Sequence, residues 1–345
     1  MEHKRKKAVI KKRKKNVTAL LLLFVAYQLV FAPGCDEFSQ PKSPEIKDTN
    51  LVASWSQALQ IIQEALVDAD PLVRARAIEV VASTGQLKLM PQVQRLMQDQ
   101  YVPVRFAAAL AVGDAGYSPA KSSLNKLLKD RDSNVVIAAA YAMVKLGSLE
   151  HLQILRKAAT DNDQMVRANA VLLLGKSGDQ GSLQLLWNTL QDRSSDDKVK
   201  FQSAEAIATL GDRKIFSKLW AMLISAYADD RLMGVKAMGE LKTPDAKNAL
   251  IGMLDEDILE VRLAAAGQLG LLRDPIGEPK VLEVFEKNLT NDMDLQAAER
   301  TNVLISLAIG QIRTPALKKF LPKMLRNDSK FVRIAAAKAV FQCLK

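Results

Sequence analysis

The chain has 345 residues, of which 48% are hydrophobic, 25% charged and 5% aromatic, a composition typical of a globular, helix-rich protein. Its net charge of +11 is concentrated at one end: residues 1–16 hold nine basic residues and one acidic residue, which leaves +3 for the remaining 329. Nucleic-acid binding needs a concentrated basic surface, so this nearly neutral body argues against it. The two cysteines, Cys35 and Cys343, lie at opposite ends of the sequence and exclude a disulfide framework or a four-cysteine zinc site.

The first predicted element is a signal or anchor segment over residues 1–35. Its basic block is followed by an uncharged apolar run, residues 17–32, and then by small residues ending at Gly34 and Cys35. This order is typical of a secretory signal, and the basic charge directs the rest of the chain to the outer side of a membrane. Gly34 and Cys35 resemble the end of a lipobox, which implies lipidation of Cys35, although Pro33 departs from that motif.

Two other interpretations of this segment remain open. The apolar run can stay as an uncleaved anchor, although sixteen residues are slightly fewer than the about 17–25 that a spanning helix needs. It can also be a buried core helix, but nine neighbouring basic residues do not suit a packed domain. The first two interpretations both hold the body at a membrane. Residues 36–52, rich in Ser, Pro and charged side chains, then form a disordered tether.

A thirteen-residue pattern repeats nine times in the rest of the chain, residues 53–345. Clear copies are VRARAIEVVASTG from Val73, VRFAAALAVGDAG from Val104 and VRANAVLLLGKSG from Val166. Its second position, usually Arg, falls at 74, 105, 136, 167, 200, 231, 262, 300 and 333, most often 31 residues apart. A second stretch of apolar residues three and four apart precedes most copies, so each unit is predicted as two amphipathic helices of about eleven residues.

Three further columns indicate how these units stack. Three residues after the Arg column the side chain is usually Ala, which allows neighbouring helices to approach closely. Seven residues after it the side chain is large and apolar, and fills the layer between helices. Eleven residues after it, the first five copies have a glycine that can end a helix in the left-handed conformation.

Acidic residues recur six positions before the Arg column. They are Asp68, Asp99, Asp130 and Asp161, with Asp294 in a divergent copy. We interpret them as an Asp–Arg ladder between successive turns, rather than as metal ligands or acid–base carboxylates. Val136 replaces Arg in the third copy and is expected to leave Asp130 unpaired.

This pattern, D-x5-R-x2-A-A with a terminal L-G in units of about 31 residues, resembles the short HEAT repeat of phycobilisome-lyase-like proteins. The resemblance implies an all-α fold, a right-handed solenoid of about nine antiparallel helix pairs. It also implies that the second helix of each pair lines the concave side, which such proteins commonly use to hold other macromolecules.

Two enzyme types within this resemblance set the alternatives for function. Deoxyhypusine-hydroxylase-like members bind two irons through repeated His-Glu motifs, but this chain has only His3 and His151. Lyase-like members hold a chromophore in a groove, and no motif here matches them residue by residue. We therefore predict a non-enzymatic scaffold without a cofactor, with a lyase-like enzyme or enzyme subunit holding a small molecule in the groove as the alternative.

The concave face is the predicted site for a protein partner of unknown identity. Positions two, five and nine after the Arg column should point away from the paired helix. The candidate binding residues are Leu110, Tyr141 and Leu172, which are apolar residues at the same position of three successive repeats. Lys145 and Lys176 are predicted at the rim of this apolar patch. An exposed apolar patch with a polar rim is typical of a protein interface. Burial of these side chains between rungs by the curvature of the solenoid is the other possibility.

Overall fold

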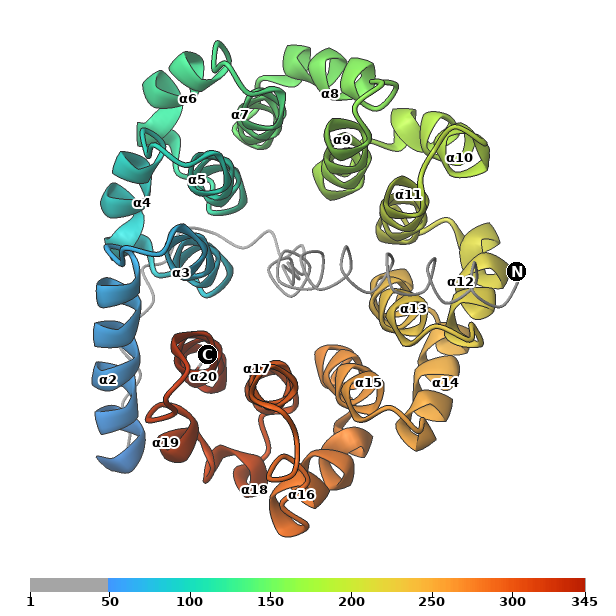
Figure 1. Ribbon diagram of the computed structural model, residues 1–345. Helices are drawn as coiled ribbons and strands as arrows, with labels where there is room; N and C mark the ends of the chain where they lie inside the picture. The colour runs from blue at the N-terminus through green and yellow to red at the C-terminus, as the bar shows by residue number, and fades with distance from the viewer. Residues whose placement is uncertain (1–48, 345) are drawn as a thin grey trace, which may run out of the picture. The chain divides into compact units, whose positions relative to one another are not determined.

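The computed structural model describes residues 49–344, in which helices alternate between an outer and an inner layer (Figure 1). The outer layer consists of α2 (Thr49–Ala65), α4 (Met90–Leu96), α6 (Lys121–Leu127), α8 (Leu152–Ala158), α10 (Leu183–Gln191), α12 (Phe216–Leu223), α14 (Pro244–Gly252), α16 (Glu278–Glu286), α18 (Pro315–Lys318) and α19 (Leu321–Met324). The inner layer consists of α3 (Pro71–Ser83), α5 (Val102–Asp114), α7 (Ser133–Lys145), α9 (Gln164–Ser177), α11 (Asp197–Thr209), α13 (Ala228–Leu241), α15 (Leu259–Leu271), α17 (Leu295–Ile312) and α20 (Lys330–Cys343). No strand occurs in residues 49–344, and the predicted all-α solenoid is confirmed.

Each inner helix coincides with one copy of the sequence repeat, and local signals fix where it begins and ends. At the start of α3, Asp70 accepts a hydrogen bond from the backbone N–H of Leu72 at 2.8 Å, and Pro71 is the first helical residue. The five predicted terminal glycines all have positive φ; they are Gly85, Gly116, Gly147, Gly178 and Gly211. In the sixth and seventh copies Lys242 and Arg273 take the same conformation, with φ of 54° and 61°.

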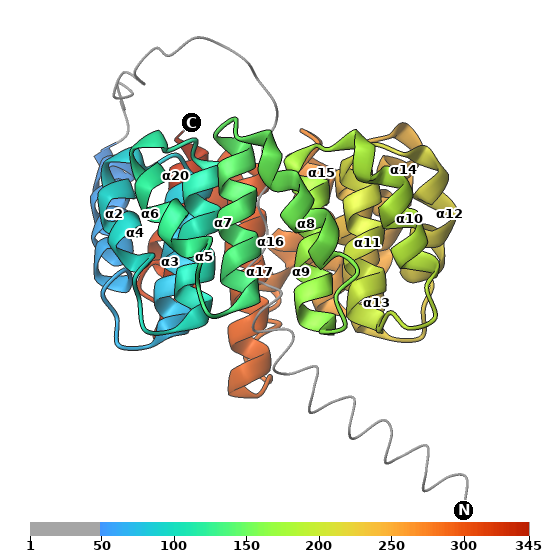
Figure 2. The ribbon, with the colours of Figure 1, turned by 90° about the horizontal axis from the view of Figure 1, so that it is seen from above.

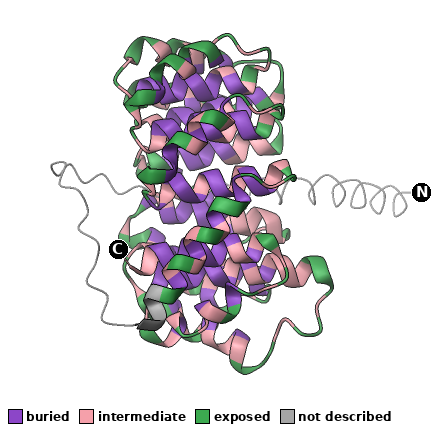
Figure 3. Ribbon diagram, turned by 90° about the vertical axis from the view of Figure 1, so that its left-hand side faces the viewer, coloured by how far each residue is buried: buried purple, intermediate pink, exposed green. Residues whose placement is uncertain are grey.

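The small and large columns are buried as the sequence predicts. Gly234, in the small column, faces Met222 and Leu223 of the paired outer helix. Neighbouring inner helices also approach closely: a Cβ added to Gly175 of α9 would lie 2.5 Å from the Cα of Ala206 in α11. The buried residues therefore gather between helices, whereas exposed residues lie on the outer helices and loops (Figure 3).

The two helices of a pair differ in length more than the sequence predicts. Between α4 and α16 the outer helices have only seven to nine residues, and a short 3-10 turn precedes most of them. The inner helices have thirteen or fourteen residues, except α17, which has eighteen. At the start of the solenoid α2 begins at Thr49, four residues before the predicted boundary at 53.

The solenoid closes into a ring, a feature that the repeat pattern of the sequence does not predict. The last inner helix, α20, packs against the first pair, α2 and α3 (Figures 1 and 2). Trp55 of α2 makes an edge-to-face contact with Phe341 of α20, with ring centroids 4.7 Å apart. Lys330 of α20 forms an ion pair with Asp68, in the turn before α3, and Lys338 forms one with Glu79 of α3. We call this contact between the last helix and the first pair the seam.

One of the seam ion pairs supplies a basic partner for Asp68, the first of the acidic residues that recur six positions before the Arg column. Asp68 precedes the first repeat, so no earlier repeat is available to supply a partner. Lys330 of the last repeat takes that place, with its Nζ 2.6 Å from Oδ2 of Asp68. The first and last repeats thus meet as neighbours do elsewhere in the solenoid.

Candidate protein-binding face

The inner face of the ring is built from the positions that point away from the paired outer helix. Gly234 shows that the column three after the Arg faces the outer helix, because its neighbours are Met222 and Leu223 of α12. A helix turns by about 100° per residue, so the column five residues after the Arg points to the side opposite the column three residues after it. That column carries charged residues on several inner helices, including Glu79, Glu205 and Lys338.

One polar cluster joins three successive inner helices. Lys176 of α9 lies 2.9 Å from Asp114 of α5, measured between Nζ and Oδ2. Between them Tyr141 of α7 donates its hydroxyl hydrogen to Oδ1 of the same carboxylate. The ammonium group of Lys176 also lies 5.3 Å from the centre of the Tyr141 ring, within the range of a cation–π contact. Asp114 thus holds together side chains from three repeats.

Two further pairs join neighbouring inner helices through the same column. Glu205 of α11 pairs with Lys236 of α13 at 2.8 Å, and Glu79 of α3 pairs with Lys338 of α20 at 3.1 Å across the seam. All four side chains are nearly buried, so each charge needs its partner. Nearby, burial raises the pKa of the Glu240 carboxyl, and the Glu205 carboxylate raises it further, whereas nearby lysines lower it.

The predicted apolar patch is not exposed, and this expectation is wrong. The side chains at these positions are almost fully buried: Leu110 is 2% exposed, Tyr141 1% and Leu172 7%. The close approach of neighbouring inner helices encloses these side chains, which is the possibility that the sequence left open. At the predicted rim, Lys145 is exposed, whereas Lys176 is half-buried in the cluster with Asp114. Whether these residues bind a partner stays a prediction.

The Asp–Arg ladder exists, but in a different register from the predicted one. Four arginines of the Arg column bind the acid 25 residues later, in the following repeat; the pairs are Arg74–Asp99, Arg105–Asp130, Arg167–Asp192 and Arg231–Glu256. Asp130 is therefore paired, with Arg105 at 2.8 Å, contrary to expectation. Because the arginine comes from the preceding repeat, Val136 instead leaves Asp161 without a guanidinium, and Asp161 is exposed.

The guanidinium groups also fix the turns between helices. Arg105 donates through Nη1 to the carbonyl oxygens of Asp99 and Gln100, at 2.9 and 3.1 Å, while its other nitrogens bind Asp130. Partial burial alone would raise the pKa of Asp130, but hydrogen bonds from Arg105 and from the Asp132 backbone N–H bring it below its usual value. These carboxylates hold the turns and are fully used in that role.

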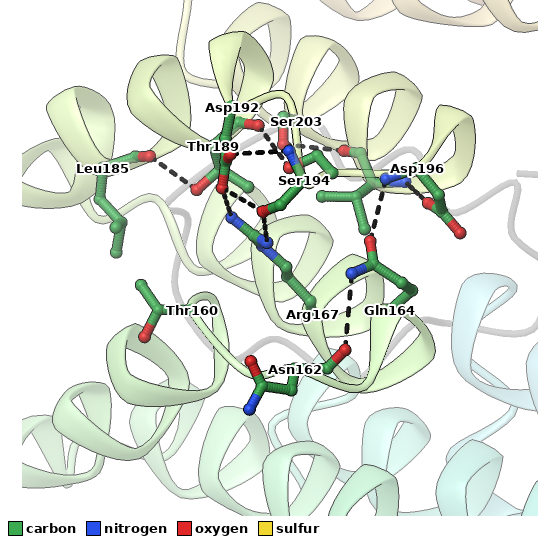
Figure 4. Close-up of polar contacts among 12 residues, drawn as sticks. Thr160, Asn162, Gln164, Arg167, Leu185, Thr189, Asp192, Ser194, Asp196 and Ser203 are labelled. Carbon is green, nitrogen blue, oxygen red and sulfur yellow. Dashed lines mark hydrogen bonds and ion pairs between the residues drawn. The ribbon is translucent and has the colours of Figure 1, made fainter.

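The longer loop between α10 and α11 keeps the ladder intact despite two extra residues (Figure 4). Arg167 donates to Asp192 and to the hydroxyl of Ser194, which in turn donates to Asp192 at 2.7 Å. The Ser194 backbone N–H, followed by Arg167, lowers the pKa of Asp192 to about 2. Gln164 accepts a hydrogen bond from the backbone N–H of Asp196 at 2.9 Å and secures the far end of the loop.

The catalytic and metal-binding candidates considered from the sequence do not gather into a site in residues 49–344. No group of three or more His, Cys, Asp or Glu side chains there is arranged to hold a metal ion. Cys343 is half-buried, and burial raises the pKa of its thiol to about 11. Cys35, the predicted lipidation site, and His3 lie outside the described residues. No helix within the described part is long and apolar enough to cross a membrane.

Known structures with similar folds share little sequence with this chain. Human deoxyhypusine hydroxylase in complex with glycerol is 17% identical, with a TM-score of 0.38, and the match covers 76% of this chain and 98% of that one. The complex of CpcE and CpcF of phycocyanin lyase from Nostoc is 17% identical, with a TM-score of 0.32 over 89% and 98% of the two chains. Importin beta is 15% identical, with a TM-score of 0.35 over 84% and 47%. Such distant likenesses carry no inference about activity.

Sequence comparison is more specific about the family. Among curated proteins, no match was found. The sequence pattern of HEAT repeats matches residues 58–145, 122–208 and 152–232, which together cover more than half of the 345 residues. The matched stretches contain the first five copies of the repeat found in the sequence and the start of the sixth. The chain therefore belongs to the HEAT-repeat family.

Proposed function

We propose that this protein is a non-enzymatic scaffold that binds a protein partner through the inner face of its ring. The observation that carries the proposal is the arrangement of the second helices, which bring residues from all parts of the solenoid to one inner layer (Figure 1). Lys145 is exposed at the end of the inner helix α7, nine residues after the Arg column and so at a position that points away from the paired outer helix. Such a surface suits recognition of a polar or charged protein segment.

The proposal includes a membrane location, which rests on the sequence alone. Residues 1–35 have the basic, apolar and small-residue order of an exported segment, with Cys35 as the acyl acceptor. The ring would then be held on the outer side of a membrane, either by lipid on Cys35 or by an intact anchor. Mass spectrometry of the mature N-terminus distinguishes the two, because a lipidated Cys35 would be the first residue of the mature chain, whereas an anchor leaves the N-terminal segment in place.

Binding through the inner face is tested with a pair of exposed lysines. Lys145→Glu reverses a charge at the inner face, whereas Lys126→Glu makes the same change on the outer helix α6. After mild crosslinking of the full chain in its membrane, Lys145→Glu should recover several-fold less of a partner that the wild type and Lys126→Glu recover equally. Equal recovery with both variants would place the binding surface elsewhere.

The alternative, an enzyme holding a small molecule in the groove, has its own test. Purified full-length protein should show no absorption beyond that of its tyrosines and tryptophans. A visible absorption band that survives dialysis would favour a bound chromophore over the scaffold. None of the inner-face contacts described above favours that alternative.

A further inference from the structure

An exposed aromatic and apolar stripe runs along the outer helix α12 and into the following loop. Trp220 is 46% exposed, Ile224 67% and Tyr227 52%. The helix lies on the outside of the ring in both Figure 1 and Figure 2, so this stripe faces away from the inner surface.

The local packing of α12 explains why these residues face outward. Leu219 and Leu223 are buried and hold the helix against the rest of the solenoid. Trp220 and Ile224, each one position further along, therefore turn away from that contact. Phe216 stacks on Trp220 with ring centroids 6.3 Å apart, which fixes the indole on the surface.

Basic side chains flank this stripe without any acidic residue between them. Arg213, Lys214 and Lys218 are all exposed, and residues 213–224 contain no Asp or Glu. The preceding acid, Asp212, accepts hydrogen bonds from the indole N–H of Trp187 at 2.9 Å and from the Lys214 backbone N–H at 3.0 Å. Its carboxylate is thus held within the fold.

Acidic residues beyond the stripe are also held by local structure. Asp230 accepts a hydrogen bond from the hydroxyl of Ser225 at 2.7 Å, and burial raises the pKa of Asp229. The exposed surface of α12 is therefore positively charged as well as aromatic. We call Arg213, Lys214, Lys218, Trp220 and Ile224 the α12 patch.

We propose that the α12 patch docks on an anionic lipid surface. Tryptophan and tyrosine favour the boundary between headgroups and acyl chains, and lysine and arginine beside them favour anionic headgroups. The core of a protein interface is instead depleted in lysine, and a stable interface needs about 800 Å² on each partner. A patch of a few residues on the outside of a ring suits a lipid surface better, because lipid imposes no demand for complementary shape.

Docking of the patch goes beyond the proposed scaffold function and does not depend on the inner face. It is tested with full-length protein and vesicles whose acyl chains are brominated, because bromine quenches a tryptophan that enters the membrane. Vesicles of phosphatidylcholine with phosphatidylglycerol are compared with vesicles of phosphatidylcholine alone. The signal of Trp220 is the difference in quenching between the wild type and Trp220→Phe.

Replacing Arg213, Lys214 and Lys218 by Gln separates the patch from the basic leader, which both proteins retain. If each base contributes about 1 kcal/mol near an anionic surface, the three changes should weaken docking of Trp220 on the order of a hundred-fold. The matched control replaces three exposed lysines on and after α6 by Gln; they are Lys121, Lys126 and Lys129. This control should quench as the wild type does with phosphatidylglycerol vesicles.

Three outcomes would overturn the proposal. Vesicles that carry the protein on flotation could leave Trp220 unquenched. The α12 triple variant could be quenched as strongly as the α6 control. The emission of Trp220 could also shift with protein concentration in the absence of lipid, which would make the patch an interface between copies of this chain. Flotation with both triple variants and circular dichroism confirm that the leader still binds and the fold is intact.

Discussion

The closed ring can be tested at the ion pair that joins its ends, Glu79 with Lys338. The two side chains are 11% and 5% exposed, and their charged atoms lie 3.1 Å apart. At an effective dielectric constant of about 20, charges at this separation attract by about 5 kcal/mol. Desolvation of both groups offsets much of this attraction, so we expect a coupling free energy of about 1–3 kcal/mol.

A double-mutant cycle isolates this coupling from other effects of each change. The free energy of unfolding in urea is measured for Glu79→Gln, Lys338→Met, the double variant and the wild type. The matched control is the same cycle with Glu205→Gln and Lys236→Met, which joins neighbouring helices within the ring at 2.8 Å. Coupling at Glu205–Lys236 together with none at Glu79–Lys338 would show that the seam is open in solution, and the closed ring would be refuted.

Four further predictions follow from close packing, backbone conformation and pKa values. Gly175→Ala should lower the unfolding free energy by about 1–3 kcal/mol, because the added Cβ meets the next inner helix. Gly252→Ala, with open space around the added Cβ, should leave the unfolding free energy unchanged or raise it. Equal effects of the two variants in denaturant unfolding would contradict this packing. Lys242→Gly should raise the melting temperature, since a left-handed lysine costs about 1 kcal/mol, and a fall would refute it. The pKa of Asp192 is lowered to about 2, so its stabilising effect is complete above about pH 4 and is lost as the pH falls towards 2. Asp192→Asn should therefore flatten the acid side of the curve of unfolding free energy against pH. A curve unchanged from that of the wild type would exclude this role. Cys343, with a pKa of about 11, should not react with a disulfide reagent at pH 8 until the protein unfolds, and rapid reaction in the native state would contradict its burial.

Features that depend on one helix and its immediate neighbour could be predicted from the sequence. The left-handed ends at Gly85 and Gly178 follow from glycine at a fixed position in the repeat, and the structure has positive φ at both. The cap of α3 by Asp70 is similarly local, because donor and acceptor are two residues apart. The assignment of second helices to the inner layer came instead from the family resemblance, and Figure 1 confirms it.

Closure of the ring could not be predicted in the same way. Whether nine pairs form an open arc or a full circle depends on the rotation between successive pairs, and a small difference accumulates over the whole array. The charges at the seam give no separate signal: Glu79 and Lys338 are 259 residues apart, and each could equally face solvent at an open end. By contrast, Glu205 and Lys236 both lie five residues after the Arg column, in consecutive copies. Their opposite charges at this shared position are a signal in the sequence from which the pair could have been predicted.

Two wrong expectations, the exposed apolar patch and the register of the ladder, have the same origin: the sequence does not specify how neighbouring repeats contact each other. Leu110 and Leu172 are buried because neighbouring inner helices approach within contact of glycine and alanine backbones, a distance that the repeat period does not specify. The predicted ladder is one repeat out of register. The sequence shows that Asp130 lies six residues before position 136, but it does not show which repeat supplies the guanidinium that binds Asp130. Arg105 does so because the turn that holds Asp130 lies over the preceding repeat.

Closure also restricts how the proposed partner would reach the inner face. A ring offers two routes: a chain segment enters through one of its open ends, or the seam separates and admits a folded surface. The seam is held by the packing of α20 against α2 and α3, which includes the contact between Trp55 and Phe341, and by ion pairs of which only Glu79–Lys338 is nearly buried. Weakening that seam leaves the first route unaffected and favours the second. The coupling free energy between Glu79 and Lys338 is therefore one part of the free energy needed to open the ring, beside the packing of α20 against α2 and α3, and it bears on which of the two routes the proposed partner would take.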